Sequence, residues 1–212
     1  MIRLDIFSDP VCPWCYIGKA NLDRALEGKP DHPFTIEWHP FQLNPEMAAE
    51  GVDRAEYLAA KFGPRVDEIN ARVTDAFAAA GLQIDMAKIP RIANTLDAHR
   101  LIHWAGLEGR QAAVVSALFR AYWREGRDIG DRDVLAQIAG DAGMDRAMTA
   151  RLLGSDADAD DIAARDADAR AKGVNAVPTY LIAQQYVLSG AQPPELWGQV
   201  IGELSAQIAV QV

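Results

Sequence analysis

Cysteine is nearly absent from this sequence, and its scarcity excludes a scaffold held by disulfide bonds. Cys12 and Cys15 are the only two cysteines in 212 residues, and they are three positions apart. Cysteines so close cannot staple distant parts of a fold, so the pair is redox-active or half of a metal site. A structural zinc site usually needs a second such pair. The chain has none, and only His99 and His103 of its histidines lie close together, so we expect no metal.

Long apolar runs and excess positive charge are missing as well. No apolar run reaches the roughly 18 residues that could cross a bilayer. The first apolar stretch contains Asp5 and shows no leader-like cleavage site, so we expect a cytoplasmic protein without a membrane partner. Lys and Arg total 21 against 30 Asp and Glu, a formal net charge of −9. Without a basic patch, nucleic acid is excluded as a partner.

The remaining composition is that of one folded protein. Half of the residues are hydrophobic and 24% are charged, which is typical of a globular chain. A length of 212 residues fits one large domain, or a small domain that carries a substantial insertion.

The opening forty residues predict a βαβ unit. Residues 3–8 alternate apolar and polar side chains as a short strand does, and Asp9-Pro10 ends them. Residues 16–27 have helical spacing, and residues 34–38 form a second strand. The cysteine pair therefore lies where the first strand passes into the helix.

The middle of the chain predicts helices. Apolar residues recur at helical spacing from about residue 44 to 172, as in the stretch 115–122, and Asp131 has the place of an N-cap. The Asp-rich segment 155–171 should be a mostly solvated helix. Apolar stripes on the helices of the region 44–172 would allow a homodimer.

Strands return near the end of the sequence. Residues 178–183 and 186–189 predict a hairpin joined at residues 184–185. A last helix follows with Pro193-Pro194 at its entrance. The predicted order is thus βαβ, a helical block, and ββα.

This order resembles the DsbA superfamily. The motif Cys12-Pro13-Trp14-Cys15 and the later Val177-Pro178 stand at the matching places, and four segments look like its FrnE branch: DPVCPWCYIGK, FQLNP, NTLDAHRL and SGAQ. The resemblance implies an α/β, thioredoxin-like fold with a large all-helical insertion. Residues 1–43 and 173–212 would form the thioredoxin-like domain, and residues 44–172 the helical insertion domain.

The position of the cysteine pair predicts its chemistry. The N-terminus of a helix stabilises negative charge, so Cys12 should form the attacking thiolate. Cys15, one turn further, should be less exposed and act as the resolving thiol. Pro13 and Trp14 should tune the turn between them.

The resemblance adds a second working residue, Pro178, as a cis-proline opposite the cysteines. The backbone of Val177 would then be open to a peptide or glutathione. Without the resemblance a trans bond is the better prediction, because few X–Pro bonds are cis.

Other residues have two interpretations each. Trp14 either contacts substrate or covers the helix start. Asn94 either caps the next helix or faces the active site. Gln192 either caps the last helix or binds the carboxylate end of glutathione, as its region does in related kappa-class transferases. His99 and His103 are packing or surface residues rather than catalysts.

Three functions follow. The first is a thiol–disulfide oxidoreductase acting on protein or small-molecule disulfides, with no bound cofactor and with glutathione as a possible co-substrate. The second is a glutathione-dependent isomerase or transferase of the 2-hydroxychromene-2-carboxylate isomerase and kappa type. Those relatives carry a serine-centred motif instead of the cysteine pair, so the intact pair favours redox chemistry. The third is a non-catalytic chaperone or binding module, in which the cysteines would be inert.

Overall fold

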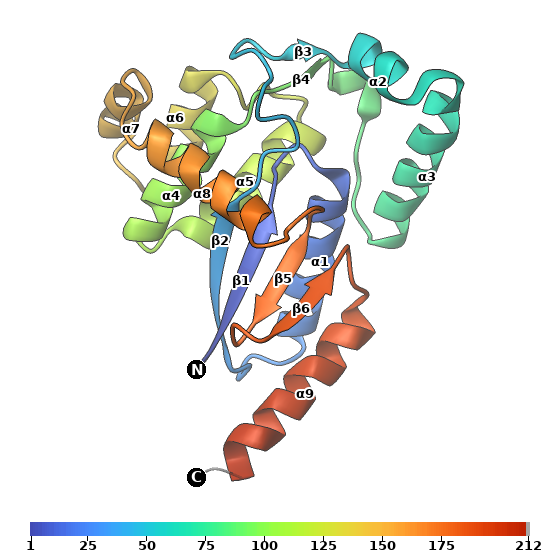
Figure 1. Ribbon diagram of the computed structural model, residues 1–212, viewed down its shortest axis with the longest axis vertical. Coiled ribbons are helices and arrows are strands. Elements are labelled where there is room, and N and C mark those ends of the chain that lie inside the picture. The colour runs from blue at the N-terminus through green and yellow to red at the C-terminus, as the bar shows by residue number, and fades with distance from the viewer. Residues whose placement is uncertain (211–212) are drawn as a thin grey trace.

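A four-stranded sheet forms the centre of the protein in this computed structural model, which describes residues 1–210 and their side chains up to Ile208 (Figure 1). β1 runs parallel to β2 and antiparallel to β5, and β6 returns beside β5. The strand order is β2-β1-β5-β6, with bounds Phe34–Pro40 for β2, Ile2–Ser8 for β1, Thr179–Ile182 for β5 and Tyr186–Ser189 for β6. Both ends of the chain therefore contribute to one sheet.

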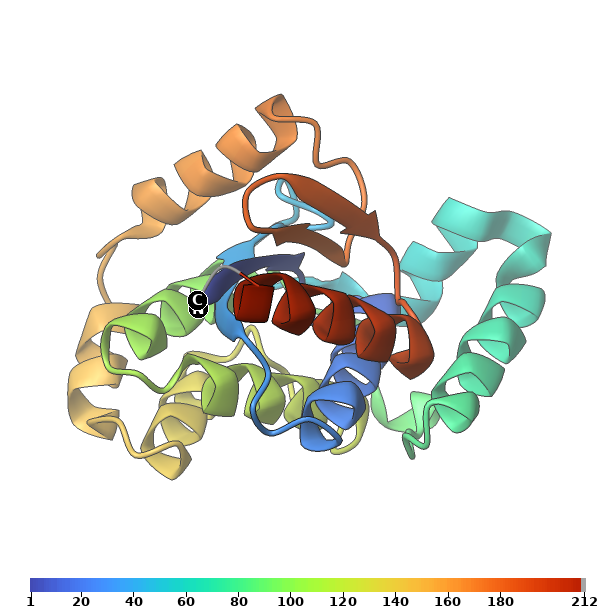
Figure 2. The same ribbon diagram turned by 90° about the horizontal axis from the view of Figure 1, so that it is seen from below.

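Helices lie on both faces of this sheet. α1 (Pro13–Glu27) and α9 (Pro194–Val210) pack together on one face, and α8 (Ala159–Ala171) lies over the other (Figure 2). Because successive strand residues point to opposite faces, Leu4 and Ile6 of β1 are fully buried, while their neighbours line an open hollow near α8.

The long segment between β2 and β5 divides into two groups of helices. One group projects on the same side as α1 and consists of α2 (Arg54–Phe62) and α3 (Val66–Ala79), joined by the 3₁₀ turn Gly63–Arg65 (Figure 1). The other group packs against β2 and comprises α4 (Leu96–Leu107), α5 (Gln111–Trp123), α6 (Arg132–Asp141), α7 (Arg146–Leu153) and α8.

A short strand pair lies between the two groups. β3 (Val52–Asp53) pairs antiparallel with β4 (Arg91–Ile92), and the 3₁₀ turn Met86–Lys88 precedes β4. The sequence predicts only helices here. Two-residue strands are too short to show the alternation from which strands are predicted, so this pair depends on tertiary packing.

Most predicted elements are confirmed, with shifted ends. α1 begins at Pro13, three residues before the predicted start, because proline fits the first helical position. The hairpin connection between β5 and β6 covers three residues, and Ala183 and Gln184 have φ values of 53° and 57° in it. The Asp131 side chain accepts the N–H of Asp133, which confirms the N-cap.

The Asp-rich helix α8 begins four residues after its predicted start and buries one of its acidic side chains. Most of its side chains are exposed, as expected, but Asp166 is buried. Its carboxylate accepts the N–H of Gln42 at 2.9 Å and pairs with Arg170, one turn along α8. α8 is thereby fixed to the segment after β2. The domain boundaries at residues 43/44 and 172/173 stay a prediction.

Membrane-spanning helices are absent from the described part of the chain, where no helix combines the required length and hydropathy.

Candidate active site

The cysteine pair lies at the junction of β1 and α1. After Ser8 the chain turns, and the Cys12 N–H donates to the Asp9 carbonyl at 2.9 Å. Cys12 is the N-cap residue of α1 and has extended backbone angles, and Pro13 is the first helical residue. Helix N-termini favour anions, so the junction suits a thiolate at Cys12. The two cysteine sulfurs are 3.4 Å apart and are not bonded to each other.

Both cysteines are buried, and Cys15 is the more deeply placed. Cys12 is 3% exposed and Cys15 1%. Burial raises the pKa of Cys15, and the neighbouring Cys12 thiol raises it further, while the Ser8 hydroxyl and the Asp9 N–H act against this increase. Cys15 is therefore a poor first nucleophile, as its predicted role as resolving thiol requires.

Pro178 stands at the start of β5, beside the cysteine pair. The Val177–Pro178 bond is cis, as the resemblance predicts. The Cys12 thiol donates a hydrogen bond to the Val177 carbonyl at 3.6 Å. Gly18 allows β5 to approach α1 this closely, because a Cβ there would lie 2.4 Å from the Tyr180 hydroxyl and 3.0 Å from Pro178 Cγ.

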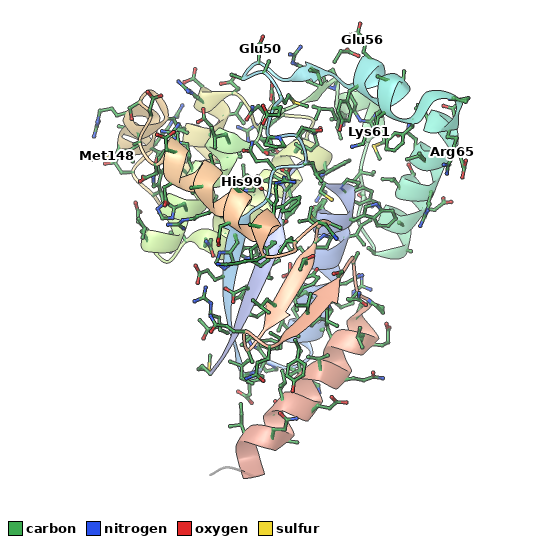
Figure 3. The ribbon with its side chains drawn as sticks, in the orientation of Figure 1. Glu50, Glu56, Lys61, Arg65, His99 and Met148 are labelled. Carbon is green, nitrogen blue, oxygen red and sulfur yellow. The ribbon has the colours of Figure 1, made fainter. Side chains whose placement is uncertain are left out.

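A cavity of about 360 Å³ opens beside Cys12. Of the predicted site residues, the structure brings Cys12, Pro13, Trp14 and Val177 to its wall. Trp14 is half-buried and also has the Arg72 guanidinium over its ring, 5.7 Å from the centroid, so it both packs and lines the cavity. The opposite wall comes from α2 and α3, whose lining residues include Arg54, Tyr57, Lys61, Phe62, Ile69 and Val73. Lys61 lies on this side of the molecule in Figure 3.

Asn94 and Gln192 do not line this cavity in the described part of the chain. The Asn94 side chain accepts the N–H of Leu96 at 2.9 Å and donates to the Met47 carbonyl, so it holds the start of α4. The Gln192 amide donates to the Ser189 carbonyl at 2.6 Å. The capping interpretation of Asn94 therefore fits the structure, and Gln192 braces the turn before α9.

An acid and an imidazole lie under the cysteine pair. Asp9 is fully buried, and its carboxylate accepts the N–H of Leu43 at 2.7 Å and that of Val11 at 3.4 Å. Burial raises the pKa of Asp9 to about 7. His99 is 2% exposed and lies inside the molecule in Figure 3, with Nε2 3.8 Å from Asp9 Oδ1. Burial lowers the pKa of His99 to about 4.

The contact between the Asp9 carboxyl group and His99 Nε2 requires a proton on one of the two groups. His99 Nε2 is buried and has no hydrogen-bond partner within the described residues. The imidazole donates to the Phe41 backbone, which leaves Nε2 unprotonated in the neutral ring, so an ionised Asp9 would place two acceptors against each other. A proton on Asp9 removes this conflict, in agreement with the directions of both pKa shifts.

His103 confirms the surface interpretation, since it is half-exposed beside Arg165 of α8. His99 confirms the packing interpretation, but its position beside Asp9 was not predicted. Sequence analysis interpreted Asp9 only as a strand breaker. An acidic residue three positions before Cys12, at the end of an apolar strand, was the available signal.

One further cluster has the ligand types of a metal site. Ligand atoms of Asp5, Glu37 and His39 lie within 4.8 Å of one another on the sheet. Arg3 pairs with Asp5 at 2.6 Å and with Glu37 at 3.1 Å. Arg3 pairs with both acids and His39 Nε2 lies 2.6 Å from Asp5 Oδ1, so the cluster is explained as an ion-pair network.

Comparison with known proteins agrees with this architecture. The family model described as a DSBA-like thioredoxin domain matches residues 3–202. The chain belongs to this DsbA-like family. The structure of SCO1869 from Streptomyces coelicolor, described as a probable DsbA oxidoreductase, is 31% identical, with a TM-score of 0.85 over 96% of this chain and 89% of that one.

More distant DsbA-like structures share the fold. A 2-hydroxychromene-2-carboxylate isomerase superposes with a TM-score of 0.74 at 18% identity, over 99% of both chains. The cytosolic disulfide reductase DsbM of Pseudomonas aeruginosa has a TM-score of 0.66 at 21% identity, over 98% of this chain and 99% of that one. A second DsbM structure contains GSH. The DsbA-like fold thus serves both oxidoreductases and an isomerase.

Proposed function

We propose that this protein is a thiol–disulfide oxidoreductase of the FrnE-like branch, with Cys12 as the nucleophile and Cys15 as the resolving thiol. The observation that carries the proposal is the pair itself. Two unbonded cysteine sulfurs lie 3.4 Å apart at a helix N-terminus, one beside a cavity and the other behind it. A dithiol of this geometry can close into a disulfide with little movement of the chain.

The reaction requires no bound cofactor. The Cys12 thiolate attacks one sulfur of a substrate disulfide, forming a mixed disulfide and releasing one substrate thiolate, which takes up a proton. Cys15 then loses its proton and attacks Cys12 sulfur, so that the protein disulfide forms and the second substrate thiol leaves. The protein dithiol is oxidised by two electrons, and the substrate disulfide is reduced by two. Two molecules of a thiol such as glutathione reverse these steps on the protein and leave as their own disulfide.

Substrate access to Cys12 runs through the cavity beside Val177. In the reduced protein the Cys12 thiol donates to the Val177 carbonyl. A substrate backbone N–H can replace the thiol as the donor to this carbonyl, while the cis-proline contributes no N–H of its own. Protein disulfides, small-molecule disulfides and glutathione are all proposed partners. The DsbM structure with GSH supports glutathione, and the cytosolic description of DsbM supports the predicted cytoplasmic location.

The isomerase is the second candidate, favoured by the structural likeness to 2-hydroxychromene-2-carboxylate isomerase. That function needs a site for a glutathione thiolate but no resolving thiol. Cys15, buried and in contact with Cys12, would then have no chemical role.

Serine variants of the two cysteines distinguish the candidates. For an oxidoreductase, Cys15→Ser should trap Cys12 in mixed disulfides detectable by mass analysis, and Cys12→Ser should abolish insulin reduction. For an isomerase, Cys12→Ser should retain glutathione-dependent turnover of an aromatic substrate, because a serine hydroxyl can still hydrogen-bond a thiolate. Retained turnover without a trapped adduct in Cys15→Ser would overturn the proposal.

A further inference from the structure

Arg54 is a partly buried charge that the protein leaves unneutralised beside the cysteine pair. It is the first residue of α2, and its guanidinium donates to Asn70 Oδ1 at 3.1 Å and to Met86 Sδ at 3.3 Å. Neither partner carries a charge. None of the Asp and Glu side chains that the structure describes forms an ion pair with Arg54, and burial lowers its pKa. An unpaired charge in such a place costs stability.

The cavity next to Arg54 carries positive charge only. Lys61, one to two turns further along α2, is its second cation, and the Lys61 ammonium donates to the Tyr57 hydroxyl at 2.8 Å. The Tyr57 hydroxyl donates in turn to Asn44 Oδ1 at 2.7 Å. Within residues 1–208, no Asp or Glu lines this cavity, although acids outnumber basic residues by 30 to 21 in the chain.

The remaining walls are largely apolar and aromatic. Trp14, Tyr57, Phe62 and Trp123 supply rings, and Cys12 lies among them. A volume of about 360 Å³ is at the lower end of small-molecule sites. Cations set in aromatic walls match a compact ligand that has a flat or apolar body and an anionic group.

We propose that this cavity selects low-molecular-weight disulfides that carry a carboxylate on an apolar or aromatic body, with Arg54 as the carboxylate-binding residue. The inference rests on the proposed exchange function and names its substrate class. Arg54 holds the carboxylate, the rings hold the body, and Cys12 meets the disulfide sulfur. Lys61 is exposed and adds a weaker attraction. The substrate carboxylate supplies the counter-charge that the chain omits.

The test compares two disulfides of equal shape, dithiodibenzoate and its neutral diamide. The rate at which each oxidises the fully reduced protein is followed by Trp fluorescence and divided by its rate with mercaptoethanol, which removes the difference in intrinsic reactivity. The acid should be preferred about tenfold, the scale of one charge-assisted hydrogen bond. Arg54→Gln should abolish most of this preference, Arg54→Lys should retain part of it, and added salt should reduce it.

Arg151→Gln is the matched control. The Arg151 guanidinium also contacts a methionine sulfur, Met148 Sδ at 3.5 Å, but it lies on α7, away from the cavity. This variant should keep the full preference. Arg151→Gln should also leave insulin reduction unchanged, which shows that the exchange reaction itself is intact.

The outcomes distinguish a failure of the proposed substrate class from a failure of the proposed exchange function. Equal normalised rates for acid and diamide in the wild-type protein would overturn the inference, and this measurement needs no variant to fold. A preference that survives in both Arg54→Gln and Lys61→Gln would overturn the assignment to this cavity. If neither disulfide nor insulin reacts with the dithiol, the exchange function itself fails, and the substrate class fails with it.

Discussion

Ionisable groups on the two sides of the cysteine pair differ in whether they keep their charge. On the cavity side, Arg54 and Lys61 keep their charges without a carboxylate partner in the described part of the chain. Beneath the pair, Asp9 and His99 are buried, and burial shifts both pKa values toward the neutral forms. An unpaired charge is tolerable where a ligand or water can reach it. Where neither can reach, a proton neutralises the acid instead.

Two arginines provide the strongest test of this comparison. Arg100 of α4 is 1% exposed, and its guanidinium donates to Asp97 and to three backbone carbonyls, of Ala157, Leu152 and Ser155. Arg100→Gln should lower the free energy of unfolding by about 3–5 kcal/mol, because buried partners lose their donor. Arg54→Gln should change it by less than about 1 kcal/mol. Urea unfolding of both variants measures the difference, and an equal loss would remove the distinction between the two charges.

The acid and imidazole under the site predict opposing effects of pH. Asp9, with its pKa raised from 3.8 to about 7, keeps a proton in the folded state that the unfolded state releases, so its contribution to stability falls as pH rises through this window. The pKa of His99 is lowered from 6.5 to about 4, so between these values the unfolded state binds a proton that the folded state does not. The contribution of His99 to the free energy of unfolding therefore rises with pH between 4 and 6.5. In the wild-type protein, these two contributions to the pH dependence of the unfolding free energy should therefore nearly cancel.

Replacing one of the two residues should reveal how the other changes the unfolding free energy with pH. In Asp9→Asn, the free energy of unfolding should increase by about 3 kcal/mol from pH 4 to 6.5, since one pKa unit corresponds to about 1.4 kcal/mol. In His99→Gln, it should decrease by a similar amount, about 3 kcal/mol, over the same range. Urea unfolding at several pH values gives these slopes. Two variants with the flat profile of the wild type would show that Asp9 and His99 do not share a proton.

The cysteines themselves should differ in reactivity by more than tenfold. Cys12 lies at the helix N-terminus and lines the cavity, whereas burial raises the pKa of Cys15. Iodoacetamide should label Cys12 quickly, because Cys12 faces the cavity at the helix N-terminus, and should label Cys15 only slowly. Peptide mass analysis across a pH series resolves the two sites. Equal labelling rates of the two cysteines would contradict the assigned roles.

The smallest effect is expected at the mouth of the cavity. Lys61→Gln should change the unfolding free energy by less than about 0.5 kcal/mol, because Lys61 is exposed and forms no ion pair with a described residue. Lys172→Gln, which breaks the exposed pair between Lys172 and Asp168, should have an effect of the same size, about 0.5 kcal/mol or less. Thermal unfolding compares them. A loss well above that of Lys172→Gln would mean that Lys61 stabilises the fold rather than the ligand.

Local patterns were sufficient to predict the redox half of the site. Cys12 and Cys15 are neighbours on one helical turn, so their contact follows from spacing. The resemblance carried by the motif segments also predicted the cis bond before Pro178, which spacing alone would not have favoured.

Groups distant in sequence could not be placed in the same way. Asp9 and His99 are 90 positions apart, and only the packing of α4 under the β1–α1 junction brings their side chains together. Nor does the sequence around Arg54 show that its neighbours in space, Asn70 and Met86, are uncharged.

The sequence by itself determined the βαβ and ββα ends of the fold, the position of the dithiol and the family, because these depend on periodicity and on residues within a few positions of each other. Tertiary structure alone decided which charges are sealed and which face the cavity. Desolvation depends on every atom packed around a group, whichever part of the chain supplies it. The raised pKa of Asp9 and the unpaired charge of Arg54 therefore depend on segments that lie far from them in sequence.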